Sequence, residues 1–265
     1  MHLIILAIVV FLIALVMTMT GRGGGNFYVV ALIITGQTIY NSATMGQFIL
    51  MLTAVAGMLI FHKHKLIDWK LALVIDPPTD IMAFVGGYFS GHISGFYLKI
   101  IFAALLVLAG LLMFLKINDT PITKDKKFGF WHRTYGENKY VVNLWLVIPI
   151  TAIVGLASGA LGISGGSFKV PLMVLLCGIP MRIAVGTSAA MVAATALMGF
   201  IGHTASGHFD SHLAIPLGIA AVTGGILGGK LAIKTKPKNL KAIFAYTTLA
   251  AAVFMIINAL LAKLS

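Results

Sequence analysis

Long uncharged stretches of apolar sequence restrict the fold of this 265-residue chain more than any other feature. Six of them cover residues 1–21, 23–61, 100–115, 140–168, 183–209 and 242–262. Several exceed the roughly 20 residues with which an α-helix crosses about 30 Å of hydrocarbon. Apolar residues make up 59% of the chain and charged residues 10%, which excludes a soluble enzyme, a nucleic-acid-binding protein and a disordered chain. The sequence therefore predicts an all-α polytopic protein of the cell membrane, in contact with the lipid bilayer.

The chain also repeats itself. A shift of 142 residues places Asp68 on Asp210 and residues 98–103 on residues 240–245, and a shift of 141 places residues 24–29 on residues 165–170. Self-similarity of this kind indicates a duplication. We therefore expect a first membrane repeat at residues 1–115, a cytoplasmic linker at 116–140, and a second membrane repeat at 141–265.

Each repeat contains five apolar segments. They lie near residues 3–20, 26–36, 41–61, 71–90 and 97–115 in the first half, and near 141–162, 167–177, 182–202, 212–233 and 240–262 in the second. The second segment of each half follows a glycine cluster and is only about a dozen residues long, too short for a full span. It predicts a broken or re-entrant helix in each half.

The distribution of Lys and Arg predicts how the halves are oriented. If all five segments of a half change side, the loops 61–70, 116–139 and 234–241 share a face and hold three, six and four basic residues. The opposite face holds only Lys99 and Lys263. Basic loops stay in the cytoplasm, so we expect an inverted repeat with both termini outside the cytoplasm.

The glycine clusters predict an anion site. Glycines that open a short helix at membrane depth leave backbone N–H groups unpaired at the positive end of a helix dipole. The candidate ligands are backbone groups, two cations that flank the clusters, and two hydroxyls: Gly24, Gly25, Asn26, Gly165, Gly166, Ser167, Arg22, Lys169, Thr187 and Ser188. The alternatives are that the glycines serve only close helix packing and that the hydroxyls bond their own helix backbone.

Asp76 and Asp80 are unexpected in an apolar segment. Pro77 and Pro78 separate them, and we expect these prolines to interrupt the helix. If the helix resumes, the four-residue spacing places both carboxylates on one face. Carboxylates within the membrane are candidates for proton coupling. The alternative is a structural ion pair with Arg22 or Lys169, or a kink near the interface.

The sequence Gly162-Ile-Ser-Gly-Gly-Ser-Phe-Lys-Val-Pro-Leu172, followed by Gly178-Ile-Pro180 and Ala184-Val-Gly-Thr-Ser188, resembles the TauE/SafE-like sulfite exporter family, also called the toluene sulfonate uptake permeases. The first half is less similar to the family pattern, with Val30 in place of the proline and Asn41-Ser-Ala-Thr44 in place of Ala-Val-Gly-Thr. The resemblance implies transport of sulfite, sulfonates or related organic acids.

We therefore expect a secondary transporter, an exporter by this resemblance, which moves a small sulfur-containing anion by alternating access. Protons are a candidate coupling partner; no cofactor, metal site or catalysis is expected, and no nucleotide-binding loop is present. Two alternatives remain. One is an uptake carrier for metal cations or coupled to protons, with Asp76 and Asp80 facing the substrate. The other is a membrane-embedded sulfur-transfer enzyme or an assembly scaffold, although for the enzyme Cys177 lies in an apolar segment without an adjacent base.

Overall fold

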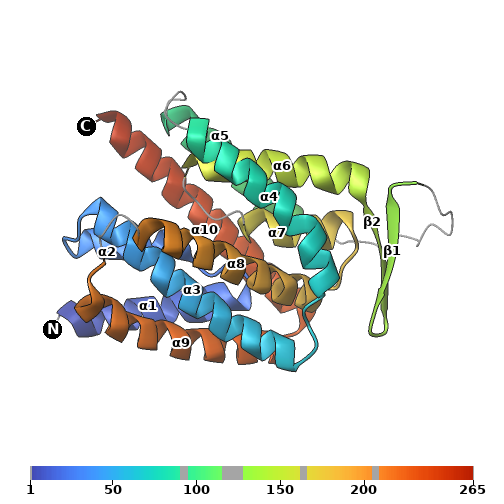
Figure 1. Cartoon of the computed structure of the whole chain (residues 1–265), viewed down its shortest axis with the longest axis horizontal. Helices are drawn as coiled ribbons and strands as arrows, with labels where there is room; N and C mark the ends of the chain where they lie inside the picture. Colours follow the sequence, from blue (N-terminus) through green and yellow to red (C-terminus); the bar gives the residue numbers. More distant parts are fainter. Residues whose placement is uncertain (1, 90–94, 115–127, 162–165, 205–208, 265) are drawn as a thin grey trace. The chain divides into compact units, whose positions relative to one another are not determined.

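A computed structural model describes residues 2–89, 95–114, 128–161, 166–204 and 209–264 (Figure 1). The elements are α1 (His2–Met19), α2 (Gly25–Ile34), α3 (Ile39–Lys63), α4 (Trp69–Phe89), α5 (Gly95–Leu112), β1 (Phe130–Tyr135), β2 (Asn138–Asn143), α6 (Leu144–Leu161), α7 (Gly166–Pro171), the π-helical turn η2 (Leu172–Leu176), α8 (Met181–Thr204), α9 (Ser211–Lys234) and α10 (Pro237–Leu264). The predicted all-α class is confirmed. The two short helices, α2 and α7 with η2, lie where the sequence predicts them.

Length and composition identify membrane helices among the described residues. Four stretches are long and apolar enough to cross a bilayer: Asn41–Lys63, Met181–Ile201, Ser211–Lys234 and Pro237–Ile257. Large apolar side chains are exposed on several helices, including Ile34 at 79% and Phe84 at 78%. Such surfaces are stable only against lipid or a partner. The chain is a multi-pass membrane protein.

Contacts group the helices into two compact units. Unit 1 comprises Met1–Ile67 and Val185–Lys236. In it α9 packs along α1 and α3, and α2 packs on α3. Glycines of α9 allow the close approach to α1, because a Cβ at Gly224 would lie 2.5 Å from the carbonyl oxygen of Phe11, and one at Gly228 would overlap that of Leu15. Small residues hold membrane helices together in this way.

Unit 2 comprises Asp68–Ala184 and Pro237–Ser265. Here α4 packs along α6 and α5 along α10. The core joins α5, α6, α7 and α10 through Leu106, Val154, Phe168 and Ala252. Buried apolar contacts therefore hold the short helix α7 on one side. Its polar residue Lys169 contacts α4.

The helix pairing agrees with a duplicated chain. The repeat relates α1 to α6 and α9 to α4, so the pair α1 with α9 in unit 1 corresponds to the pair α6 with α4 in unit 2. The matched aspartates also have the same role. Asp210 accepts hydrogen bonds from the N–H groups of His212 and Leu213 at the start of α9, and Asp68 accepts one from Leu71 at the start of α4. The repeat boundaries and the opposite orientation of the halves stay predictions.

The expectation that Pro77 and Pro78 interrupt a helix is wrong. Helix α4 continues from Trp69 to Phe89 with both prolines inside it. Packing compensates for the two missing N–H donors, since α4 lies so close to α6 that a Cβ at Gly155 would overlap the carbonyl group of Thr79. Asp76 and Asp80 therefore lie one turn apart on one helix, on the same face.

A β-hairpin occupies the end of the predicted linker. Residues 130–135 pair with residues 138–143 in antiparallel register, and Gly136, with a φ of 58°, begins the two-residue turn. A glycine with positive φ at this position favours a tight hairpin. The prediction of a linker at residues 116–140 did not include this hairpin.

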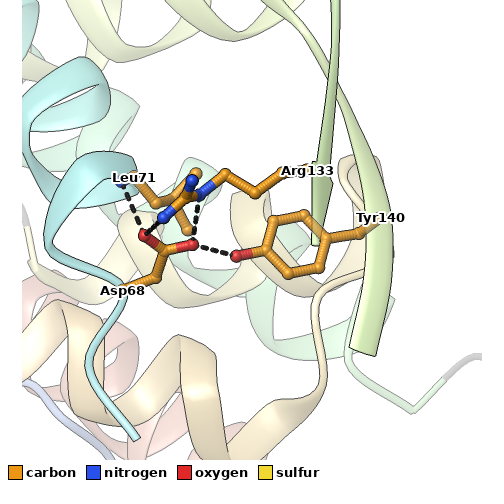
Figure 2. A network of polar contacts seen from close by, with 4 residues as sticks. All are labelled: Asp68, Leu71, Arg133 and Tyr140. Carbon is orange, nitrogen blue, oxygen red and sulfur yellow. Dashed lines mark hydrogen bonds and ion pairs between the residues drawn. The ribbon is translucent and has the colours of Figure 1, made fainter. Parts of the chain in front are cut away.

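Figure 2 shows how the hairpin is attached to the start of α4. Arg133 of β1 donates from Nε to Oδ2 of Asp68 at 2.6 Å and from its terminal nitrogen to Oδ1, and the hydroxyl of Tyr140 of β2 donates to Oδ2. Asp68 is fully buried. Burial alone would raise the pKa of the Asp68 carboxyl, but the hydrogen bonds from Arg133, Tyr140 and the Leu71 N–H outweigh it and lower that pKa. The network fixes the end of the helix that carries Asp76.

Asp68→Asn should loosen the hairpin without removing the helix cap, because asparagine caps helices about as well as aspartate. Losing a hydrogen-bonded charge costs about 1.5–3 kcal/mol, so trypsin should cleave after Lys139 at least about ten-fold faster. Asp210→Asn is the matched control, since Asp210 caps α9. Because the pKa of Asp68 is lowered, this stabilisation should be complete above about pH 4 and lost as the pH falls further. Equal cleavage of both variants would contradict this role.

Candidate functional site

The start of α2 carries the first candidate cluster, in unit 1. Gly24 precedes the helix in the left-handed conformation, with a φ of 82°, and the N–H groups of Phe27 and Tyr28 donate to its carbonyl oxygen. The first N–H groups of a helix have no partner within the helix, so those of Gly25 and Asn26 are available in principle to an anion. A Cβ at Gly24 would lie 2.8 Å from Cγ of Met17, so glycine is required here.

Arg22 lies directly before this helix and is only 4% exposed. Its Nε donates to Oγ1 of Thr20 at 3.4 Å, and a terminal nitrogen lies 3.7 Å from the sulfur of Met17. Arg22 thus places a buried guanidinium directly before the positive end of α2.

Thr187 and Ser188 of α8 belong to the same unit and are fully buried. The hydroxyl of Ser188 donates to the carbonyl oxygen of Gly21 at 2.8 Å. Ser188 therefore positions residues 21–24, the glycine loop that precedes α2. The hydroxyls of Thr18 and Ser42 are buried without a hydrogen-bond partner in the described part of the chain. No local sequence pattern separates these two residues from other membrane threonines and serines, so neither was predicted as a site residue.

The second candidate cluster lies in unit 2, at α7. Gly166 is the first residue of this helix and is buried, Ser167 is partly exposed, and Gly165 lies outside the described residues. The helix spans six residues and continues into the π-turn η2 after Pro171. Prolines and π-turns are each known causes of distortion in helices. A helix this short has a weak dipole, so a charged side chain must dominate the electrostatics here.

Lys169 of α7 is that side chain. It is 3% exposed and forms an ion pair with Asp76 of α4, whose side chain is 13% exposed. The ammonium donates to Oδ1 of Asp76. The structure thus joins a residue predicted to bind an anion to one predicted to carry protons, and it agrees with the alternative of an ion pair. The role of each in transport stays a prediction.

Comparison with known proteins identifies the family. The model of the sulfite exporter TauE/SafE family matches residues 6–255. The chain belongs to the TauE/SafE family. The resemblance noted in the sequence is therefore confirmed, and the protein is a membrane transporter.

Several curated TauE/SafE-like relatives are similar over almost their whole length. The probable membrane transporter protein YunE of Bacillus subtilis is 27% identical over 91% of this chain and 92% of its own. A probable membrane transporter protein of Xylella fastidiosa is 25% identical over 88% and 87%, and MJ0441 of Methanocaldococcus jannaschii is 25% identical over 89% of each chain. No solved structure matches the chain significantly.

Three observations bear on the metal-uptake and sulfur-transfer alternatives. Among the described residues, no group of three or more His, Cys, Asp or Glu side chains could hold a metal ion. A cation at Asp76 would have to displace the Lys169 ammonium. Cys177 is buried, at 3% exposed, and buried structural thiols are generally inert.

Proposed function

We propose that this TauE/SafE family member is a secondary transporter that exports a small sulfur-containing anion such as sulfite, a sulfonate or a related organic acid, by alternating access. The observation that carries the proposal is the buried ammonium of Lys169 within the short helix α7. A lysine inside the membrane is costly unless it pairs or serves a substrate, and an anion is the substrate whose charge it complements.

The start of α2 supports the same substrate class. It combines a helix N-terminus, a left-handed glycine loop and the buried guanidinium of Arg22. We assign Gly24, Gly25, Asn26 and Arg22 to anion binding in the first half, and Gly165, Gly166, Ser167 and Lys169 to it in the second, together with the hydroxyls of Thr187 and Ser188 of α8. A membrane potential of 100 mV contributes about 2.3 kcal/mol per charge, enough to drive an anion outward.

Calorimetric titration of the purified protein tests this proposal. The ligands are sulfite, thiosulfate, ethanesulfonate, acetate and Zn²⁺. We expect the three sulfur anions to bind in competition with one another and Zn²⁺ not to bind. Binding of Zn²⁺ alone would favour the metal-uptake alternative, and binding of no ligand to folded protein would contradict a transporter of these anions.

The Lys and Arg distribution further leads us to propose that both termini lie outside the cytoplasm and the hairpin inside. Glu137, exposed in the hairpin turn, provides the test as Glu137→Cys in a Cys177→Ser background. A thiol reagent that cannot cross membranes should label it in inside-out vesicles but not in intact cells. Labelling in intact cells would place the hairpin outside and reverse the topology.

A further inference from the structure

An apolar groove lies between α3 and α9 of unit 1, lined by Phe48 and Leu52 of α3 and by α9 residues between Ile215 and Thr223. Its volume is about 290 Å³, near the lower limit for ligand pockets, which suits a slender chain. The hydroxyl of Thr223 donates to the carbonyl oxygens of its own helix at Ile219 and Ala220. The groove therefore offers a ligand apolar contacts and is no site for a small anion.

Helices α3 and α9 run side by side in the same direction (Figure 1). The order of their contacts shows this direction. A Cβ at Gly218 would lie 2.7 Å from Leu52, and a Cβ at Gly229, further along α9, would lie 3.1 Å from Ile60, further along α3. The carboxyl ends of the two helices therefore lie at nearly the same level, at the same end of the groove.

A lysine ends each of these two membrane spans, Lys63 in α3 and Lys234 in α9. Lys63 follows the groove residue Leu52 by eleven residues, and Lys234 follows the groove residue Thr223 by eleven. Eleven residues are about three helical turns, so each lysine lies on the same face as its groove residue, about 16 Å further along the helix. That rise is close to half of the roughly 30 Å hydrocarbon core. The lysines thus lie at head-group depth when the groove lies within the hydrocarbon.

The charge at this end of the groove suits an anionic head group. Lys65 and Lys236 follow the two helices, and neither residues 39–67 nor residues 211–236 include an Asp or Glu. Lysines also anchor ordinary spans and oppose the helix dipole, but neither role involves a groove that leads to them. The orientation proposed above places these ends in the cytoplasmic leaflet, whose anionic lipids attract basic segments.

We propose that unit 1 binds one anionic phospholipid, with its phosphate beside Lys63 and Lys234 and one acyl chain in the groove between α3 and α9. At the end away from the lysines, Phe48 packs against Phe200 and Phe209, with ring centroids 5.2–5.6 Å apart. These rings bound the space for the chain. The site shares no residue with the proposed anion site, and this inference goes beyond the proposed function without depending on it.

Native mass spectrometry of the whole purified protein in detergent tests the lipid site. The probes are dioleoylphosphatidylglycerol, dioleoylphosphatidylcholine and inorganic phosphate. We expect one phosphatidylglycerol to bind saturably, at least about ten-fold more tightly than phosphatidylcholine, and inorganic phosphate to leave it bound. Equal affinity for the two lipids would overturn the head-group assignment. Displacement by inorganic phosphate at the concentration of the lipid would assign the lysines to free phosphate instead.

Lys63→Gln with Lys234→Gln tests the head-group contacts. This double variant should bind phosphatidylglycerol about ten-fold or more weakly and phosphatidylcholine as the wild type does, because only the charged head group uses the lysines. Lys139→Gln with Lys238→Gln is the matched control. Both of its lysines are exposed in unit 2, so the control removes the same charge and should retain the lipid. Unchanged binding of phosphatidylglycerol in the first double variant would overturn the site.

Ile219→Trp tests the groove, because the larger side chain occupies the space of the acyl chain. Ile219 is 63% exposed, and Ile4 of α1, which does not line the groove, is 67% exposed. Phosphatidylglycerol should bind at least about ten-fold more weakly to Ile219→Trp and as in the wild type to Ile4→Trp. Equal binding by the two variants would place the chain elsewhere and overturn the proposal. A wild-type dimer that Ile219→Trp dissociates, with no lipid bound, would assign the groove to a second copy.

Titration with ethanesulfonate separates this inference from the proposed function. Its affinity should be the same in the wild type, in Ile219→Trp and in Lys63→Gln with Lys234→Gln. If ethanesulfonate does not bind but the lipid preference is found, the lipid site stands without the proposed anion transport. If ethanesulfonate binds and the lipid preference is lacking, the lipid site is overturned alone.

Discussion

Removal of the Lys169 charge is expected to weaken anion binding by about a hundred-fold or more. Lys169→Gln alone would leave Asp76 as an uncompensated buried charge, which costs about 3–5 kcal/mol and endangers the fold. The comparison is therefore between Asp76→Asn and the double variant Asp76→Asn with Lys169→Gln, in which two neutral amides replace the ion pair. The double variant loses the charge and one donor, and its two amide N–H donors are neutral, whereas each hydrogen bond that involves a charged group is worth about 1.5–3 kcal/mol.

The measurement is calorimetric titration with ethanesulfonate and sulfite, together with the thermal unfolding of each variant. Lys230→Gln is the matched control, because Lys230 of α9 is exposed and has the same side chain. It should bind as the wild type does. Equal affinity of the double variant and Asp76→Asn would mean that Lys169 has no part in anion binding and that its ion pair is structural.

Substitution of Gly24 is expected to abolish the contribution of α2 to anion binding. Gly24 has a φ of 82°, and a Cβ there would lie 2.8 Å from Cγ of Met17 and 3.0 Å from Cγ2 of Ile13. Gly24→Val therefore combines backbone strain of about 1–2 kcal/mol with a collision that must displace the start of the helix. Because hydrogen bonds to a charged ligand are worth about 1.5–3 kcal/mol each, we expect at least about ten-fold weaker binding of ethanesulfonate.

Gly36→Val is the control that separates the effect of backbone strain from that of a displaced helix start. Gly36 follows the other end of α2, has a φ of 90°, and a Cβ there would meet nothing within 4 Å. It should lower thermal stability through the same backbone strain but leave anion affinity unchanged. If Gly24→Val binds as tightly as Gly36→Val, the glycines before α2 serve helix packing alone.

The sequence predicts the membrane helices well because a span in lipid requires a long run of predominantly apolar residues. The broken helices were also predictable, since Gly25–Ile34 and Gly166–Leu176 are too short to cross a bilayer and follow glycine clusters. The interruption at Pro77 was predicted wrongly because local rules omit the packing of α4 on α6, which holds the helix together despite two missing donors.

Contacts between distant residues could not be predicted in the same way. Lys169 and Asp76 are 93 residues apart in the chain, and sequence reasoning offered both Arg22 and Lys169 as partners for the aspartates. The hairpin was not predicted because its basic residues indicated a cytoplasmic loop. The turn at Gly136 and the aromatic and β-branched residues that favour strands were therefore not used as evidence for a hairpin. Its link from Arg133 to Asp68 depends on the fold as a whole.

Flux into proteoliposomes tests most directly whether the chain transports sulfur-containing anions. Purified protein is reconstituted, and the uptake of labelled sulfite and thiosulfate is followed beside vesicles that contain the double variant Asp76→Asn with Lys169→Gln. We expect saturable uptake of both anions by the wild type, inhibition by ethanesulfonate, and uptake by the double variant at the level of empty vesicles. If folded wild-type protein moves neither anion under an imposed potential or a proton gradient, it is not a transporter of these anions.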